Sequence, residues 1–382
     1  MEKDSHDHAD TLSEILGQPH LWQEVFEAIL EHKQGLEAFL VPILHLEDLR
    51  IILTGAGSSA FIGEAVQGIL QDETQRMTEA IATTNLVTHP KLFFLKQVPT
   101  LMISFARSGN SPESLEAIHL ANFYCEHIFH LIITCNKSGE IVKNRDGKRN
   151  YIFLLPEKSN DKGLAMTGSF TSMLLSITLI AKLYKIDTLE PSLVCLKEIA
   201  YSFMNKQLSS IKNIARRPFK RMIFLGSGPL LGIARECHLK LQELTDGQVI
   251  CKYDSFLGFR HGPRVVANEE AIIVYLFSND DFVFQYEKDL VESIAADLVV
   301  VPTISFGRKV SAPKSSLLDI EFSNQDIQSN EFYFIAATLL GQSLGFYKSL
   351  DLGLNPDNPS VSGRINRVVQ GVSIYSIENN EK

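Results

Sequence analysis

Two serine-rich turns are the segments best suited to bind an anion. The first follows the glycines of residues 55–57 and the second precedes Pro112. Each turn opens a helix-type segment, where unpaired backbone N–H groups and the helix dipole favour negative charge. Serine and asparagine also cap helices routinely, but two such turns converging on one ligand favour a phosphate site. The polar side chains concerned are Ser58, Ser59, Ser108, Asn110 and Ser111.

Charged residues recur on one face of a helix-type segment in the second half of the chain. Glu236, Lys240 and Glu243 are spaced i, i+4, i+7, and from this spacing alone a solvated ion-pair face is the simpler interpretation. His261 follows in residues 258–263 (GFRHGP), and a lone loop histidine is usually an ordinary surface residue. Isomerisation of a sugar phosphate, however, needs a carboxylate to move the proton at C2 and a second group to open the ring. Glu243 and His261 are candidates for these two roles.

The glycine turn occurs twice, because residues 53–63 align with residues 224–234 at a shift of 171 positions. An apolar strand, a glycine turn and a helix make the unit of a parallel α/β sheet, so one such sheet is expected in each half. The second serine-rich turn has no counterpart after residues 274–277, where acidic residues follow instead. An anion site is therefore expected in the first half only.

The first turn also fits the loose G-x-G-x-x-G/A pattern of dinucleotide-binding folds, at residues 55–60. That pattern requires an acidic residue at the end of the second strand, where it binds the ribose. Residues 80–84 (AIATT) provide none, so dinucleotide binding is disfavoured.

Apolar periodicity predicts helices over about residues 9–46 and then an alternation of strands and helices. Strands are predicted at 50–54, 100–105, 129–134, 151–155, 221–225, 271–277 and 298–304. Helices are predicted at 58–70, 111–124, 138–143, 165–184, 230–244, 282–295 and 328–350, with a helical linker at 189–203. The expected domains are an N-terminal helical segment (1–46), two αβα units with parallel sheets (47–200 and 201–350) and a tail that packs on the body (351–382).

Composition limits the expected partners. The 382 residues, of which 45% are hydrophobic, are enough for two cores. A net charge of −9 opposes binding to nucleic acid or to an anionic membrane, both of which require a basic surface. Five cysteines without CxxC spacing suit a reducing compartment, and no apolar run reaches the ~18 residues of a membrane span. We therefore expect a cytoplasmic protein that uses neither a metal nor another cofactor.

The motifs resemble the sugar isomerase (SIS) family, whose members pair two parallel αβα domains and bind phosphosugars. The resemblance covers about residues 49–375, and within the family the chain looks most like the tagatose-6-phosphate ketose/aldose isomerases, which are similar to galactosamine-6-phosphate deaminases. The segments that carry this narrower likeness are residues 51–57 (IILTGAG), 103–105 (ISF), 107–114 (RSGNSPES), 258–263 (GFRHGP) and 366–372 (NRVVQGV).

The isomerase half of glucosamine-6-phosphate synthase is a more distant relative with similar motifs. The resemblance to it implies that Ser59, Ser108 and Ser111 bind phosphate and that Glu243 is the C2 base. It also implies that His261 opens the ring, reaching the site from the neighbouring subunit of a two-fold dimer. Residues 163–167 match a segment that lines the sugar in that relative. The predicted substrate-binding set is Ser58, Ser59, Arg107, Ser108, Asn110, Ser111 and Thr167.

Two positions depart from that relative. Ala106 and Arg107 stand where it has Ser and Gln, so the phosphate shell is altered. Its tail lysine, which engages the sugar carbonyl, aligns with Gln370, which argues against an imine to a lysine of this chain.

The resemblance and the residues together predict an enzyme that converts galactosamine 6-phosphate to tagatose 6-phosphate and ammonia. Proton transfer at C2 turns the aldose amine into a C2 imine, which water hydrolyses. A plain ketose/aldose isomerase uses the same proton transfer and remains an alternative. A regulatory protein that only binds phosphosugars is a second alternative. Such a protein would usually carry a DNA-binding or partner-binding segment, and the N-terminal segment of about 45 residues is too short and too acidic to be a DNA-binding domain. A homodimer or higher homo-oligomer is expected.

Overall fold

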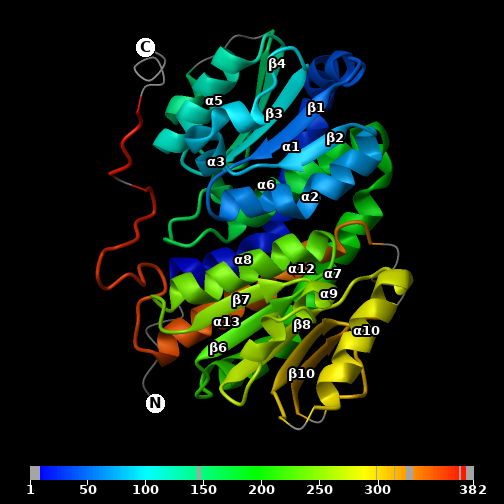
Figure 1. Cartoon of the computed structure of the whole chain (residues 1–382), viewed down its shortest axis with the longest axis vertical. Helices are drawn as coiled ribbons and strands as arrows, with labels where there is room; N and C mark the ends of the chain where they lie inside the picture. Colours follow the sequence, from blue (N-terminus) through cyan, green and yellow to red (C-terminus); the bar gives the residue numbers. More distant parts are fainter. Residues whose placement is uncertain are drawn as a thin grey trace.

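The computed structural model describes residues 9–143, 148–297, 299–313, 315–323, 330–369 and 371–375. It contains two parallel five-stranded sheets, one in each half of the chain, with helices layered between and around them (Figure 1). The first sheet has the order β2 (Met77–Ala80), β1 (Arg50–Thr54), β3 (Thr100–Ala106), β4 (Ile128–Thr134), β5 (Asn150–Leu154). The second has the order β10 (Ser316–Glu321), β9 (Thr303–Gly307), β8 (Ala271–Leu276), β6 (Arg221–Leu225), β7 (Ile250–Asp254).

Helices lie both between the two sheets and on their outer faces, and each half of the chain contributes its own set. The long helices of the first half and the linker are α1 (Asp10–Leu44), α2 (Ser58–Thr74), α5 (Pro112–Tyr124), α6 (Gly168–Ala181) and α7 (Glu190–Ala215), with the short α3 (Thr83–Thr88) and α4 (Pro90–Phe93). The second half has α8 (Pro229–Leu244), α9 (Phe256–Phe259), α10 (Asp281–Ala295), α12 (Tyr333–Ala336) and α13 (Thr338–Asp351). Central strands such as β3 and β8 are buried along their whole length, because helices cover both faces of each sheet.

The two glycine turns have the same backbone conformation, which explains the sequence repeat. Gly57 has φ 56° and ψ −131°, and Gly228 has φ 54° and ψ −126°. Both φ values lie in the region that favours glycine over residues with a Cβ atom. Two residues before each of them, a Cβ on Gly55 or Gly226 would lie within 2.6 Å of the first turn of the following helix. The repeat is therefore a steric requirement for turning directly from strand into helix.

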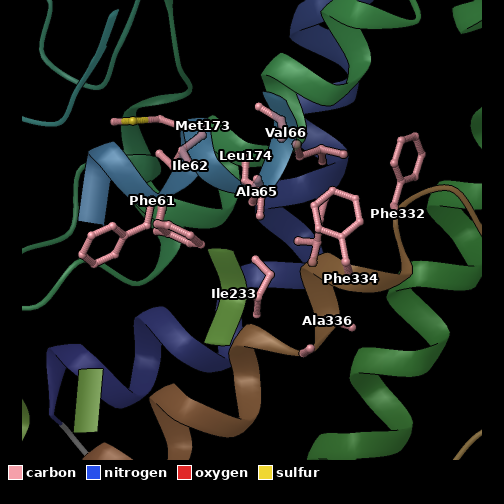
Figure 2. Packing of buried hydrophobic residues seen from close by; sticks show 14 of the residues in the cluster. Phe61, Ile62, Ala65, Val66, Met173, Leu174, Ile233, Phe332, Phe334 and Ala336 are labelled. Carbon is pink, nitrogen blue, oxygen red and sulfur yellow. The ribbon is translucent and has the colours of Figure 1, made fainter. Parts of the chain in front are cut away.

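The halves share one continuous hydrophobic core, which lies between the two sheets. The helices α2 and α8 pack together at its centre, and Figure 2 shows Ala65 of α2 near Ile233 of α8. Gly232 allows this close approach, since a Cβ there would lie 2.5 Å from the backbone nitrogen of Ala65. The first half thereby meets one face of α8 directly.

The tail after α13 runs along one side of both halves, and its described residues, 352–369 and 371–375, contain no helix or strand (Figure 1). Its Asp357 carboxylate accepts hydrogen bonds from the backbone N–H and the hydroxyl of Thr11, at the start of α1. The carbonyl of Asp357 accepts the N–H of Leu164 at 3.0 Å. The prediction that the tail packs on the body is thus confirmed. No helix in the described parts of the chain is long and apolar enough to cross a membrane.

The predicted parallel α/β architecture is confirmed, and the strands that the prediction missed all lie at sheet edges. The sequence pattern missed β2, β7 and β10, which lie at sheet edges and carry polar or charged residues where central strands are apolar. The strand predicted at 298–304 begins only at Thr303, and residue 298 lies outside the described parts. The N-terminal helices are one helix, α1, of 35 residues, and the helix predicted at 138–143 is a single 3-10 turn, Glu140–Val142. The domain limits at 47, 201 and 351 stay a prediction.

Other helix limits also differ from the predictions. The stretch predicted at 165–184 begins at Gly168 as α6, and the linker predicted at 189–203 is the longer α7. The helix predicted over 328–350 consists of α12 and α13, and residues 324–329 lie outside the described parts. These differences leave the order of the elements unchanged.

Candidate active site

A cavity of about 190 Å³ lies where the start of α2, the turn after β3, the end of α8 and the tail meet. This volume is below the ~300–1,000 Å³ of sites for drug-sized ligands and suits a small metabolite. Three lining side chains are cationic, Arg107, Lys240 and Arg367, against the single carboxylate of Glu243. The full lining comprises Ala56, Gly57, Ser58, Ser59, Phe105, Ala106, Arg107, Ser108, Ser111, Ser114, Leu164, Met166, Leu239, Lys240, Glu243, Asn366, Arg367 and Val369.

One end of this cavity lies at the starts of α2 and α5 and contains the serines predicted to bind phosphate. Ser59 in the first turn of α2, and Ser108 and Ser111 just before α5, all line it. Ser111 is the N-cap residue of α5, yet its side chain makes no capping hydrogen bond, so the capping explanation does not account for it. Helices of 17 and 13 residues direct the positive ends of their dipoles at this place. The arrangement suits a phosphate dianion.

Three predicted substrate-binding side chains have other hydrogen-bond partners. The hydroxyl of Ser58 donates to Glu236 Oε1 at 3.1 Å, although the residue lines the cavity. Asn110 is exposed outside the lining, and its side-chain oxygen accepts the N–H of Glu140. Thr167 is fully buried outside the lining, and both its N–H and its hydroxyl donate to Asp161. The structure therefore does not bring Asn110 or Thr167 into the cavity.

Asp161 holds the segment that the sequence linked to the sugar. Its carboxylate is 1% exposed and accepts hydrogen bonds from the backbone of residues 167–169 at the start of α6. The turn fixed in this way places Leu164 and Met166 in the cavity wall. The segment that the resemblance linked to the sugar thus reaches the cavity through Leu164 and Met166, whereas Thr167 lies outside the lining.

Arg107 joins three separate segments around the cavity. Its Nη1 donates to the carbonyl of Leu164 at 3.0 Å, and its Nη2 donates to the carbonyl of Arg367 in the tail at 2.7 Å. The guanidinium of Arg367 in turn donates to the carbonyl of Asp161 and to the side chain of Asn160. Burial lowers the pKa of Arg107, against the opposing effect of nearby Asp161. Arg107 therefore fastens the tail over the cavity.

The charged face of α8 is buried rather than solvated, which overturns the simpler interpretation of its spacing. Side-chain exposure is 0% for Glu236, 1% for Lys240 and 20% for Glu243. Lys240 Nζ lies 2.6 Å from Glu243 Oε2 and 3.5 Å from Glu236 Oε1. Burial alone would lower the pKa of Lys240, but the two carboxylates outweigh that effect and raise it. Lys240 is therefore held as a cation beside Glu243 in the cavity wall.

In the second half, the carboxylate of Glu287 takes the position where an anion would bind. Glu287 is fully buried, and its Oε2 accepts the backbone N–H of Ser278 at 2.9 Å, in the turn after β8. Burial raises the pKa of Glu287 to about 7, while Ser278 and the hydroxyl of Ser227 lower it. An internal carboxylate thus already uses donors that would otherwise face a ligand. This agrees with the expectation of an anion site in the first half only.

His261 lies away from the cavity in this chain. It is exposed and absent from the lining, seven residues beyond the carboxyl end of β7 at Asp254. Glu243 is near the end of α8, which leads back to the opposite, amino end of β7. At 1.5 Å per residue, α8 separates these two levels by ~20 Å. The structure therefore does not bring Glu243 and His261 together within one copy of the chain.

Several lining residues escaped prediction. Leu164, Met166 and Leu239 are ordinary apolar residues, and Asn366 and Arg367 come from an irregular tail without periodicity. The resemblance at residues 366–372 was the only available signal for the tail. Lys240 was visible through its spacing with Glu243 but was left out of the predicted site. Gln370 lies outside the described residues.

Comparisons with known proteins agree with the fold of this chain. The family model for the SIS domain matches residues 43–183. The D-galactosamine-6-phosphate deaminase AgaS of Shewanella sp. (strain ANA-3) is 37% identical over 369 residues, which cover 96% of this chain and 91% of the relative.

Two solved structures are similar over nearly their whole length. A protein of Clostridium novyi, assigned provisionally as a tagatose-6-phosphate ketose/aldose isomerase, has a TM-score of 0.91 and 39% identity, covering 96% of this chain and 95% of that one. The tagatose-6-phosphate ketose/aldose isomerase of Escherichia coli has a TM-score of 0.87 and 33% identity, covering 97% and 98%. The cavity described above therefore lies in a fold shared with these proteins.

Proposed function

The chain belongs to the SIS-domain family that includes the galactosamine-6-phosphate deaminases, and on that premise we propose that it converts galactosamine 6-phosphate to tagatose 6-phosphate and ammonia. The observation that carries the proposal is the single cavity in which an anion cradle and the Lys240–Glu243 pair meet. A protein that only binds phosphosugars would not need a buried carboxylate and ammonium beside the sugar. This observation favours an enzyme over a regulatory binding protein.

The phosphate binds at the starts of α2 and α5. Ser59, Ser108 and Ser111 donate hydroxyl hydrogen bonds to its oxygens, and the helix dipoles add to the attraction. Arg107 supplies positive charge while it also holds the tail. The sugar then extends toward the end of α8, where Glu243 lines the other side of the cavity.

Glu243 is the base of the reaction. In the open-chain aldose amine, its carboxylate removes the proton from C2 and the C1–C2 enolamine forms. The same proton returns to C1, which leaves a C2 imine. Water adds to this imine, and the C2–N bond breaks to release ammonia and the ketose. No electrons are gained or lost overall, so the reaction needs no redox cofactor.

His261 assists ring opening from a second copy of the chain. This assignment rests on the resemblance, and the ~20 Å between the levels of Glu243 and His261 supports it, because one chain alone cannot direct both groups at one sugar. A two-fold dimer would then contain two composite sites. We place the enzyme in the cytoplasm on the basis of its cysteine pattern.

A parallel assay tests the proposal. Ammonia release is measured from galactosamine 6-phosphate and glucosamine 6-phosphate, and interconversion of galactose 6-phosphate and tagatose 6-phosphate is followed beside it. We expect ammonia release, fastest from the galacto substrate. Interconversion without ammonia release would support the plain isomerase that similarity to the Escherichia coli structure suggests. Binding without any turnover would reject both enzymes.

A further inference from the structure

Glu236 is the one member of the α8 charged face that does not line the cavity. Its carboxylate is fully buried, and its Oε1 accepts the hydroxyl of Ser58 from the first half of the chain. The same oxygen lies 3.5 Å from Lys240 Nζ. Its Oε2 has no hydrogen-bond partner among the described residues.

Such burial is unfavourable for a carboxylate unless its charge is used. Burial raises the pKa of Glu236 to about 7, although Lys240 and Ser58 pull it down. A neighbouring ion pair also joins the halves but is not buried. Glu64 of α2 and Arg235 of α8 remain about one-third exposed. A structural link between α2 and α8 can therefore be made at the surface. The buried link at Glu236 requires a different explanation.

We propose that Glu236 is a positioning residue for the proton transfer at C2, which holds the Lys240 ammonium against Glu243 and ties both to the Ser58 end of the phosphate cradle. This inference rests on the proposed function of the cavity. Glu236 touches neither the substrate nor a reacting atom. It acts through Lys240, which lines the cavity while Glu236 does not.

The charge of Glu236 determines how strongly Lys240 acts on Glu243. The charged groups around it are Lys240 and Glu243 on its own helix and Arg107 after β3, which faces Lys240. With Glu236 ionised, Lys240 is shared between two carboxylates, and Glu243 remains a competent proton acceptor. Without that charge, Lys240 and Arg107 act on Glu243 alone. They then form ion pairs with Glu243 that are no longer shared, and these compete with the C2 proton for its carboxylate oxygens.

Glu236→Gln tests the proposal, with Glu64→Gln as a matched control that removes the other carboxylate joining α2 to α8. Steady-state kinetics are measured from pH 5 to 9, and C2 proton exchange is followed in deuterated solvent. We expect Glu236→Gln to lower kcat about 100-fold, as misplacement of a catalytic group by ~1 Å can do. KM should stay nearly unchanged, and the acidic limb of the kcat profile should move to lower pH. Glu236→Asp, which keeps the charge, should restore part of the rate.

Equal effects of Glu236→Gln and Glu64→Gln, or a rise in KM alone, would overturn the proposal. If Glu236→Gln does not fold, as judged by circular dichroism, Ser58→Ala removes the donor to Glu236 while the carboxylate itself stays in place. That variant should lower kcat and move the acidic limb, and an unchanged limb would count against the proposal. The wild-type assay separates this inference from the proposed function. If the wild type isomerises a phosphosugar without releasing ammonia, the same comparison on that substrate still tests Glu236.

Discussion

Glu64 and Arg235 form an ion pair where α2 packs against α8, and they lie 171 residues apart, the same shift that relates the two glycine turns. The pair is therefore its own equivalent under the repeat, which marks a local two-fold relation between the halves. The same shift takes Glu236, Lys240 and Glu243 to Ala65, Ile69 and Asp72. Only Asp72 among these is charged, so the buried Glu236–Lys240 part of the face has no counterpart on α2, and the site that it helps to form is not repeated there.

Phosphate binding should depend on the serines of the first half only. Ser108→Ala and Ser111→Ala should each weaken the affinity for galactosamine 6-phosphate by ~1.5–3 kcal/mol, the value of one hydrogen bond to a charged group. Ser227→Ala, in the glycine turn of the second half, should change it far less, because the Ser227 hydroxyl already has a hydrogen bond to Glu287. Isothermal titration with substrate or inorganic phosphate measures the effect. Comparable losses at Ser227 and Ser108 would show that both turns bind phosphate.

Removing the base should separate binding from chemistry. Glu243→Gln keeps the shape of the side chain but cannot accept the C2 proton. Substrate should still bind within a few-fold of wild type, while turnover and deuterium exchange at C1 and C2 fall by ~10²–10⁴-fold. Proton NMR in deuterated water measures the exchange. Exchange near the wild-type rate would mean that Glu243 is only a partner for Lys240.

Inactive variants should complement each other if the site is shared between subunits. Glu243→Gln and His261→Asn subunits are each expected to be inactive alone. A mixed dimer has one site with both native groups, so mixing should restore up to about half of the activity per dimer. Native mass spectrometry must first confirm subunit exchange. Confirmed exchange without recovered turnover would place both groups in one chain.

Replacing the planar guanidinium of Arg107 with an ammonium should weaken the attachment of the tail to the body. Arg107→Lys keeps the charge, but one ammonium cannot reproduce the paired geometry toward the carbonyls of Leu164 and Arg367. KM should rise roughly 10-fold, and trypsin should cut at Arg364 faster than in wild type. Arg308→Lys is the control, because Arg308 also donates to a carbonyl but lies in the second half. Equal trypsin sensitivity of both variants would contradict the role of Arg107 in holding the tail against the body.

Glu287 should make the protein less stable at alkaline pH. Its pKa is about 7 in the folded chain, above the usual 4.5, so its contribution is full below about 4.5 and is lost as the pH rises through 7. Glu287→Gln resembles the protonated acid and should therefore gain stability relative to wild type between pH 5 and 8. The shift corresponds to about 3 kcal/mol at most. Urea denaturation at both pH values measures the difference, with the exposed Glu292→Gln as a control. If the difference in unfolding free energy between Glu287→Gln and wild type were the same at both pH values, the raised pKa of Glu287 would be contradicted.

Local steric and chemical requirements made part of this molecule predictable from its sequence. The glycines at 57 and 228 fix the turns, and the central strands are recognisable as continuous apolar runs. Ser59, Ser108 and Ser111 were predictable because a helix start after a strand has a known chemical use. The edge strands were not, because exposed residues interrupt their apolar pattern.

Long-range packing determined what the sequence could not reveal. The spacing of Glu236, Lys240 and Glu243 is equally compatible with a wet surface and with a buried site. The packing of Gly232 against Ala65 decides between them, by bringing the first half onto α8. Arg367 belongs to an irregular segment, and its contact with Arg107, 260 residues away, leaves no trace in local periodicity.

The hydrogen bonds between Thr11 and Asp357 join segments from the two ends of the chain, which has a consequence for synthesis. The two residues are 346 positions apart, and Arg367, which completes the cavity wall, follows ten residues later. At ~5–20 residues per second, the ribosome makes Asp357 roughly 17–70 s after Thr11. During that interval α1 lacks its carboxylate partner and the cavity lacks its tail wall. A nascent chain therefore cannot complete the wall of the cavity until almost all of its residues have been made.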